Sequence, residues 1–233
     1  GGTASSNTDG TISSSVSANT DAGFSIVSYT GDDTAGSTVG HGLSVTPELL
    51  IWKNLDITEN FGVFNSYVCT VNSADRLYLN TNNALVTSGE DRIDALSSSV
   101  VTFGSNNSEI NNTDDFIMYC FHSVDGYSKV GSYEGNNNAD GSFIYLGFKP
   151  AMVVIKEIDA TRDWVMFDNK RNPYNEVTTV LKPNDHSAEG TARNLDFLSN
   201  GIKMRESSAY INDALTYIYI AFAESPFKTS NAR

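Results

Sequence analysis

Short apolar runs recur along the whole chain, separated by Gly, Asn, Asp and Pro. The runs are rich in β-branched and aromatic residues, which is typical of strands. No stretch repeats its apolar positions with the period of an amphipathic helix. We therefore expect strands at residues 11–16, 24–29, 49–53, 62–65, 76–80, 100–103, 116–122, 129–133, 143–146, 152–155, 163–167, 178–181, 201–204 and 216–223.

The expected strand at 116–122 is apolar on both faces. Side chains alternate between the two faces of a strand, so Ile117 and Tyr119 share one face while Met118 and Cys120 share the other. Residues 216–223 repeat this pattern. Strands of this kind are typical of the middle of a sheet between packed layers, and we expect both strands there.

The chain also matches itself. Residues 47–53 match 150–156 at a distance of 103 residues, and 116–121 match 217–222 at a distance of 101. Gly, Pro and Asn keep their order between the matched runs, which predicts an internal duplication.

The fold class that we predict is an all-β, antiparallel β-sandwich of jelly-roll or lectin-like type, duplicated into two homologous halves. Residues 1–22 are rich in Ser, Thr, Gly and Asn and are expected to be a polar linker or lead-in. Copy one is expected to span residues 23–125 and copy two residues 126–233. A single jelly roll, to which each copy contributes half of the strands, is an alternative that the pattern leaves open.

Charge changes the range of partners that we expect. The formal net charge is −13, and only 18% of the residues are charged. A nucleic-acid partner requires a basic surface, and anionic membranes repel an acidic one. No apolar run is long enough to span a bilayer. We therefore expect no nucleic-acid partner and no membrane insertion.

Few residues suggest catalysis. The three histidines His41, His122 and His186 lie in a Gly-rich turn, at a strand end and in a polar loop, and no G-x-S-x-G motif accompanies them. Cys69 and Cys120 are too few for a disulfide framework, and neither belongs to a C-x-x-C motif. We interpret both cysteines as buried thiols. A disulfide bond between them is the alternative.

Acidic loops are the remaining candidates for chemistry. Copy one has Asp32 and Asp33 where copy two has Asn136 and Asn137, so a shared acid–base pair for sugar cleavage is not expected. Asp32, Asp33 and Asp140 are weak candidate metal ligands. Asn, Asp and Gly also close hairpins, and we favour that interpretation of these loops. We expect no enzyme activity, no metal and no cofactor.

Sugar recognition suggests one further group of residues. An aromatic side chain beside hydrogen-bonding groups is a plausible binding rim. The candidate ligand-binding residues are Trp164, Arg171, Asn172, Tyr174 and Asn175. The alternative, which we favour, is an aromatic core residue followed by a turn that contains proline.

The chain resembles a domain that recurs in virion proteins of marine tailed phages. The segments that carry the resemblance are residues 23–42, 119–132, 140–156, 163–174, 197–202 and 217–233, the last (YIYIAFAESPFKTSNAR) being the most distinctive. Glu134 and residues 136–138 depart from the family's more Thr/Gly-rich turn.

The resemblance implies a function but carries over no catalytic residue. Members of the family are parts of long chains that resemble tail fibres or other appendages, and some are described as lectin-like. The expected function is a non-enzymatic structural or attachment module of a phage virion: an appendage, fibre or capsid-surface protein. The expected partners are other virion proteins and further copies of the chain, for instance in a trimer. The alternatives are a carbohydrate-binding receptor-recognition domain, with a host surface glycan as partner, and, less favoured, a polysaccharide depolymerase.

Overall fold

We analysed a computed structural model of the chain, which describes residues 2–191 and 193–226. Within these residues the chain is all-β, and its strands pair antiparallel in four sheets. The predicted fold class, an antiparallel β-sandwich, is confirmed. The described residues form two compact units: unit 1 comprises residues 2–79 and 85–122, and unit 2 comprises residues 80–84 and 123–226 without 192.

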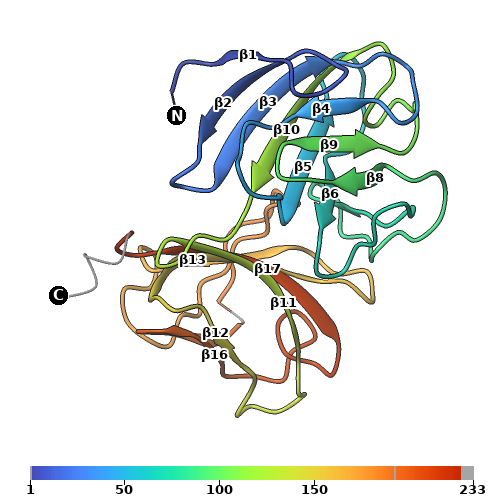
Figure 1. Cartoon of the computed structure of the whole chain (residues 1–233). Helices are drawn as coiled ribbons and strands as arrows, with labels where there is room; N and C mark the ends of the chain where they lie inside the picture. The colour runs from blue at the N-terminus through green and yellow to red at the C-terminus, as the bar shows by residue number, and fades with distance from the viewer. Residues whose placement is uncertain (1, 192, 227–233) are drawn as a thin grey trace. The chain divides into compact units, whose positions relative to one another are not determined.

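Unit 1 consists of two sheets that enclose one core (Figure 1). The larger sheet has the order β1-β2-β3-β10-β5-β6-β7, and the smaller has the order β4-β9-β8. The strands are β1 (Ser5–Asn7), β2 (Ser14–Asn19), β3 (Phe24–Thr30), β4 (Thr38–Gly40), β5 (Leu49–Asn54), β6 (Gly62–Asn65), β7 (Leu77–Tyr78), β8 (Ile93–Leu96), β9 (Val100–Phe103) and β10 (Asp115–Phe121).

Strand β10 shows how the apolar pattern places a strand. It pairs with β3 on one side and β5 on the other, so its predicted central position is confirmed. Phe116, Met118 and Cys120 are fully buried in the core of unit 1, whereas Ile117 and Tyr119 on the opposite face are partly exposed. The alternation predicted from the sequence is therefore present, with the even-numbered residues facing inward.

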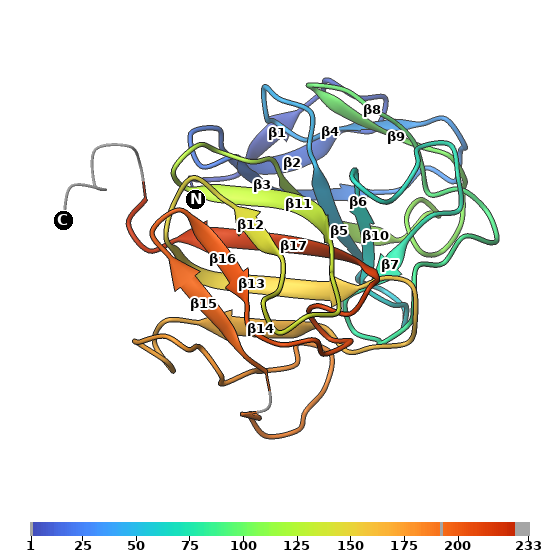
Figure 2. The ribbon, with the colours of Figure 1, turned by 90° about the horizontal axis from the view of Figure 1, so that it is seen from below.

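Unit 2 also consists of two sheets around a core of its own (Figure 2). One sheet has the order β11-β17-β13-β14, and the other has the order β12-β16-β15. The strands are β11 (Ser128–Glu134), β12 (Phe143–Tyr145), β13 (Pro150–Glu157), β14 (Val165–Asp168), β15 (Leu195–Leu198), β16 (Gly201–Met204) and β17 (Thr216–Ala223).

The two units share a strand order. The order β3-β10-β5-β6 in unit 1 corresponds to β11-β17-β13-β14 in unit 2, and β4-β9-β8 corresponds to β12-β16-β15. A buried hydrogen bond recurs as well: the Tyr29 hydroxyl donates to the Ile110 carbonyl at 2.8 Å, and the Tyr133 hydroxyl donates to the Ile211 carbonyl at 2.7 Å. A duplication predicts this agreement, but common descent of the two units stays a prediction.

Several strands differ from their expected bounds. The expected strand at 178–181 is no regular strand, because Val180 and Leu181 form only isolated bridges. The expected strand at 76–80 is reduced to Leu77–Tyr78. Strands β1, β4, β8 and β15 were not expected, since they are short and include polar residues or glycine.

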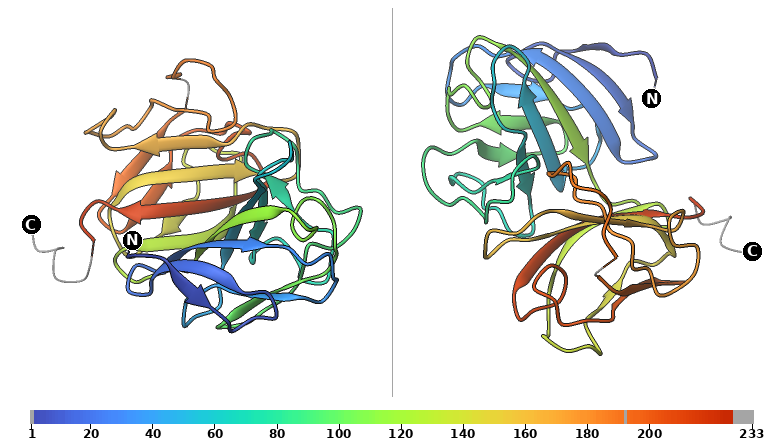
Figure 3. Two further views of the ribbon diagram at one scale, coloured as in Figure 1. Left: turned by 90° about the horizontal axis from the view of Figure 1, so that it is seen from above. Right: turned by 180° about the vertical axis from the view of Figure 1, so that it is seen from behind.

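The N-terminal segment is part of the sandwich of unit 1. Residues 1–22 were expected to form a polar lead-in, with one strand at 11–16. The structure instead has β1 and β2 paired with each other and β2 paired with β3, and the right panel of Figure 3 shows these dark-blue strands side by side. Ile12 and Val16 are buried in the core, which the polar composition of the segment conceals.

Candidate functional site

In unit 1, the N-terminal segment closes one side of the sandwich. β2 pairs with residues 24–29 of β3, the edge that the larger sheet would otherwise expose. Ile12 donates its backbone N–H to the Thr38 carbonyl at 2.9 Å, and the Ser14 hydroxyl donates to the Gly40 carbonyl at 3.1 Å. One segment thus covers an edge strand of both sheets, which removes unpaired backbone groups from solvent.

Gly40 at the end of β4 and Gly42, two residues later, make room for this segment. A Cβ on Gly40 would overlap the side chain of Asn7. A Cβ on Gly42 would lie 2.7 Å from Cγ1 of Val16, and the φ angle of Gly42 is +69°. Close packing of the segment therefore depends on the absence of side chains at these two positions.

In the described residues of unit 2, no strand corresponds to β1 or β2, so β11 and β12 are edge strands. The pairing registers identify the matching positions. Gly40 pairs with Val100 as Tyr145 pairs with Gly201, so a tyrosine stands where unit 1 has glycine. Two residues further on, Gly147 has a φ angle of +83° and matches Gly42.

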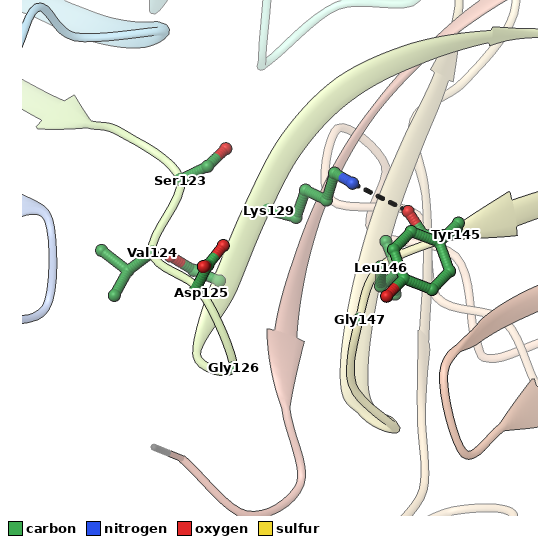
Figure 4. Close-up of a pocket in the computed structure, with 9 residues that line it drawn as sticks. Ser123, Val124, Asp125, Gly126, Lys129, Tyr145, Leu146 and Gly147 are labelled. Atoms are coloured by element: carbon green, nitrogen blue, oxygen red, sulfur yellow. Dashed lines mark hydrogen bonds between the residues drawn. The ribbon is translucent and has the colours of Figure 1, made fainter. Parts of the chain in front are cut away.

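A cavity of about 300 Å³ opens at this uncovered side of unit 2 (Figure 4). It lies between the loop at 123–126, the start of β11 and the end of β12. We call it the edge cavity. Its lining includes Ser123, Asp125, Ser128, Lys129, Tyr145 and Leu146.

Lys129 and Tyr145 define one wall of the edge cavity. The Lys129 ammonium donates to the Tyr145 carbonyl at 2.9 Å and lies 5.4 Å from the centre of the Tyr145 ring (Figure 4). Tyr145 is 61% exposed, and Phe143, two residues earlier on the same face of β12, is 46% exposed. Two aromatic side chains are therefore exposed on one face of an edge strand.

The opposite wall is held by a tight turn. Ser128 donates its N–H to the Val124 carbonyl at 3.0 Å, and Gly126 between them has a φ angle of +73°. The Ser123 hydroxyl accepts the N–H of Val130 at 3.0 Å. These bonds hold the loop, with the Asp125 carboxylate, against the first half of β11.

The rim predicted from the sequence is largely engaged in structural contacts. Trp164 is buried, with 5% of its surface exposed, so its ring offers no face to a ligand. Arg171 forms an ion pair with Asp168. Tyr174 is 84% exposed and is the only one of the five with an open aromatic face.

The two asparagines of that rim hold backbone groups. The side-chain oxygen of Asn172 accepts the N–H of Thr179 at 2.7 Å. Asn175 accepts the N–H of Phe197 at 2.9 Å and donates to its carbonyl at 3.1 Å, in the manner of a strand partner. Their side chains therefore help to hold the loop, and their part in ligand binding stays a prediction.

Two of the three acidic residues considered as metal ligands have side-chain partners, and the third lies in a turn. Asp32 accepts the Ser37 hydroxyl at 2.6 Å, and Asp33 lies in a left-handed turn with a φ angle of +55°. Asp140 forms an ion pair with Lys203 at 2.7 Å. Across the described residues, no three His, Cys, Asp or Glu side chains are grouped so as to hold a metal ion.

No histidine or cysteine is among the described residues that line the edge cavity. His41 is buried: its Nδ1 accepts the N–H of Leu43 and its Nε2 contacts the Ser97 carbonyl at 3.2 Å. Burial lowers the pKa of His41 below its ordinary value. Cys69 and Cys120 are buried free thiols, and burial raises the pKa of each to about 12, far above the range of a nucleophilic thiolate.

Sequence reasoning overlooked Tyr145, although a signal was present. The self-match aligns Gly36-Ser37 with Gly141-Ser142, so the residues that follow also correspond. Copy one continues with small or polar residues, whereas copy two continues with Phe143 and Tyr145. The change from Gly40 to an aromatic residue at an edge strand indicated a difference in exposure.

The comparisons with known proteins place the chain in a family without assigning an activity. No helix long and apolar enough to cross a membrane occurs in the part of the chain that the structure describes. No curated protein and no solved structure matches the chain. One family model matches residues 1–226, and its description is a domain of unknown function. Since this match spans more than half of the sequence, the chain belongs to that family, the domain of unknown function DUF7483.

Proposed function

We propose that the chain is a non-enzymatic structural and attachment module of a phage virion, and that it contacts its target through the uncovered side of unit 2. One observation carries the choice of surface: the side that β1 and β2 close in unit 1 has no such cover in the described part of unit 2, and two exposed aromatic residues lie there. The virion setting rests on the sequence resemblance.

The physical character of the chain supports a module that binds rather than catalyses. Each unit encloses its own apolar core, and the sheets leave mainly uncharged polar loops at the surface. Tyr145 and Phe143 expose ring surface to water, and covering this surface with a partner would be favourable. The net charge of −13 disfavours nucleic acid as that partner.

Two measurements test the proposal. Mass spectrometry of purified particles is expected to detect the chain in the virion. Fluorescently labelled chain is expected to bind host cells, and Tyr145→Ala is expected to reduce that binding by about tenfold, since the largest exposed ring of the site is lost.

Tyr67→Ala is the matched control, because Tyr67 is an exposed tyrosine of unit 1 and does not line the edge cavity. It is expected to bind as the unmodified chain does. Absence of the chain from particles, or equal binding by the Tyr145→Ala and unmodified chains, would contradict the proposal.

A further inference from the structure

We propose that the edge cavity of unit 2 binds one neutral sugar ring of a surface glycan. This inference rests on the proposed function, because it names the ligand class for the same surface. The site differs from the predicted rim around Trp164 and is made by Tyr145, Lys129 and Asp125.

Size limits the ligand to a single ring. Small-molecule sites range from about 300 to 1,000 Å³, and the edge cavity, at about 300 Å³, lies at the lower end. Neighbouring rings of an oligosaccharide would extend into solvent or along β12, where Phe143 presents a second exposed aromatic surface.

The lining matches a ligand that has one apolar face and a polar rim. The Tyr145 ring provides the apolar surface, and a pyranose presents a face of C–H groups that packs against such a ring. The Lys129 ammonium is a donor and the Asp125 carboxylate an acceptor for ring hydroxyls. Ser123 and Ser128 place further hydroxyl groups in the wall.

Charge favours a neutral sugar over an acidic one. Lys129 and Asp125 contribute opposite formal charges to the cavity wall, so the wall has no excess of positive charge to pair with a carboxylate or sulfate. The net charge of −13 on the whole chain also repels anionic glycans at long range.

An added β-strand fits this surface less well than a sugar. The Val130 N–H, which an added strand would need, is already bonded to the Ser123 hydroxyl. In unit 1 the covering segment places Asn7 where a Cβ of Gly40 would be, and the matching position of unit 2 carries the Tyr145 side chain. A segment shaped like β1 would therefore collide with Tyr145.

The test titrates the purified full chain with methyl glycosides and follows amide chemical shifts by NMR. The probes are the neutral glycosides of glucose, galactose, mannose and N-acetylglucosamine, together with those of glucuronic acid and N-acetylneuraminic acid. We expect saturable shifts at residues of the edge cavity with at least one neutral glycoside and none with the acidic glycosides at the same concentration.

Three variants locate the binding. Tyr145→Ala and Lys129→Met are each expected to weaken binding of the preferred glycoside by about tenfold or more. Tyr67→Ala, at an exposed tyrosine of unit 1 outside the edge cavity, is expected to bind it unchanged. Retained shifts elsewhere in the amide spectrum establish that each variant is folded.

The outcomes separate this inference from the proposed function. No saturable binding of any neutral glycoside, equal binding of acidic ones, or full binding by Tyr145→Ala would overturn the sugar site. If attachment to cells depends on Tyr145 but survives periodate oxidation of the cell glycans and is lost on protease treatment, the partner is a protein. The attachment function would then stand and the sugar inference would fail.

Discussion

Units 1 and 2 have the same strand order in their sheets, but one edge is covered in unit 1 and uncovered in the described part of unit 2. In unit 1, β2 pairs with β3, and hydrogen bonds from Ile12 and Ser14 hold β4. Within the described residues of unit 2, β11 and β12 have no added strand and leave the edge cavity between them. An edge that is sealed by a strand contributes to stability, whereas an edge left open provides side chains for recognition.

The units also differ in how they build one shared turn. After β5, the side-chain oxygen of Asn54 accepts the N–H groups of Asp56 and Ile57. After β13, a carboxylate oxygen of Glu157 accepts the N–H groups of Asp159 and Ala160. The turn therefore requires an acceptor at this position, and a neutral amide or a carboxylate can serve.

The largest expected effect comes from deletion of residues 2–19. The deletion exposes the core around Val16 and Ile12 and frees the edge of β3, so unit 1 is expected to lose about 4 kcal/mol or more of unfolding free energy. Each unit contains one tryptophan, Trp52 or Trp164, so single-tryptophan variants report on the units separately in urea titrations. An equal loss in both units would contradict the assignment of the segment to unit 1.

A smaller loss of stability, similar in the two units, is expected when the corresponding tyrosine hydroxyl group of each unit is removed. Tyr29→Phe and Tyr133→Phe each delete a donor to a backbone carbonyl, and each is expected to cost its own unit about 1–2 kcal/mol. Urea titration of the single-tryptophan variants measures both. Tyr174→Phe is the control and is expected to change stability by less than about 0.5 kcal/mol, because Tyr174 is exposed. A loss in only one unit would show that the two hydrogen bonds are not equivalent.

The smallest expected effect is the contribution of His41 to the pH dependence of the stability of unit 1. Burial lowers the pKa of His41 in the folded chain below the ordinary value of 6.5. As the pH falls below about 6.5, the unfolded chain therefore binds a proton that the folded chain does not, and stability falls. Unfolding of unit 1 between pH 7.5 and 5 measures this slope, and His41→Gln is expected to reduce it. An unchanged slope in that variant would assign the effect to other groups.

The strands with strong apolar patterns were predictable, and the weak ones were not. β6, β9, β16 and β17 have their expected bounds because apolar and β-branched residues with turn residues at both ends mark them. β4 (Thr38–Gly40) carries no such pattern and becomes a strand through its pairing with β9. β1, of sequence Ser-Ser-Asn, depends in the same way on β2.

The candidate site was less predictable than the fold. Trp164 and Tyr145 both lie in expected strands, and the apolar pattern within a strand does not distinguish a buried aromatic residue from an exposed one. The structure buries the first and exposes the second. Exposure depends on which segment packs over a strand, and that segment is distant in sequence.

The amino-acid sequence by itself determined the fold class and the central strands, because alternation and turn residues act over short distances. Only the tertiary structure decided which edge is covered, and it also decided which residues oppose each other across strands. Trp52 is accommodated because Gly62 opposite it has no Cβ, whereas unit 2 pairs Ile155 with Val165. Such complementary volumes arise from packing between strands. The strand propensities of single residues do not predict which side chains will pack against each other.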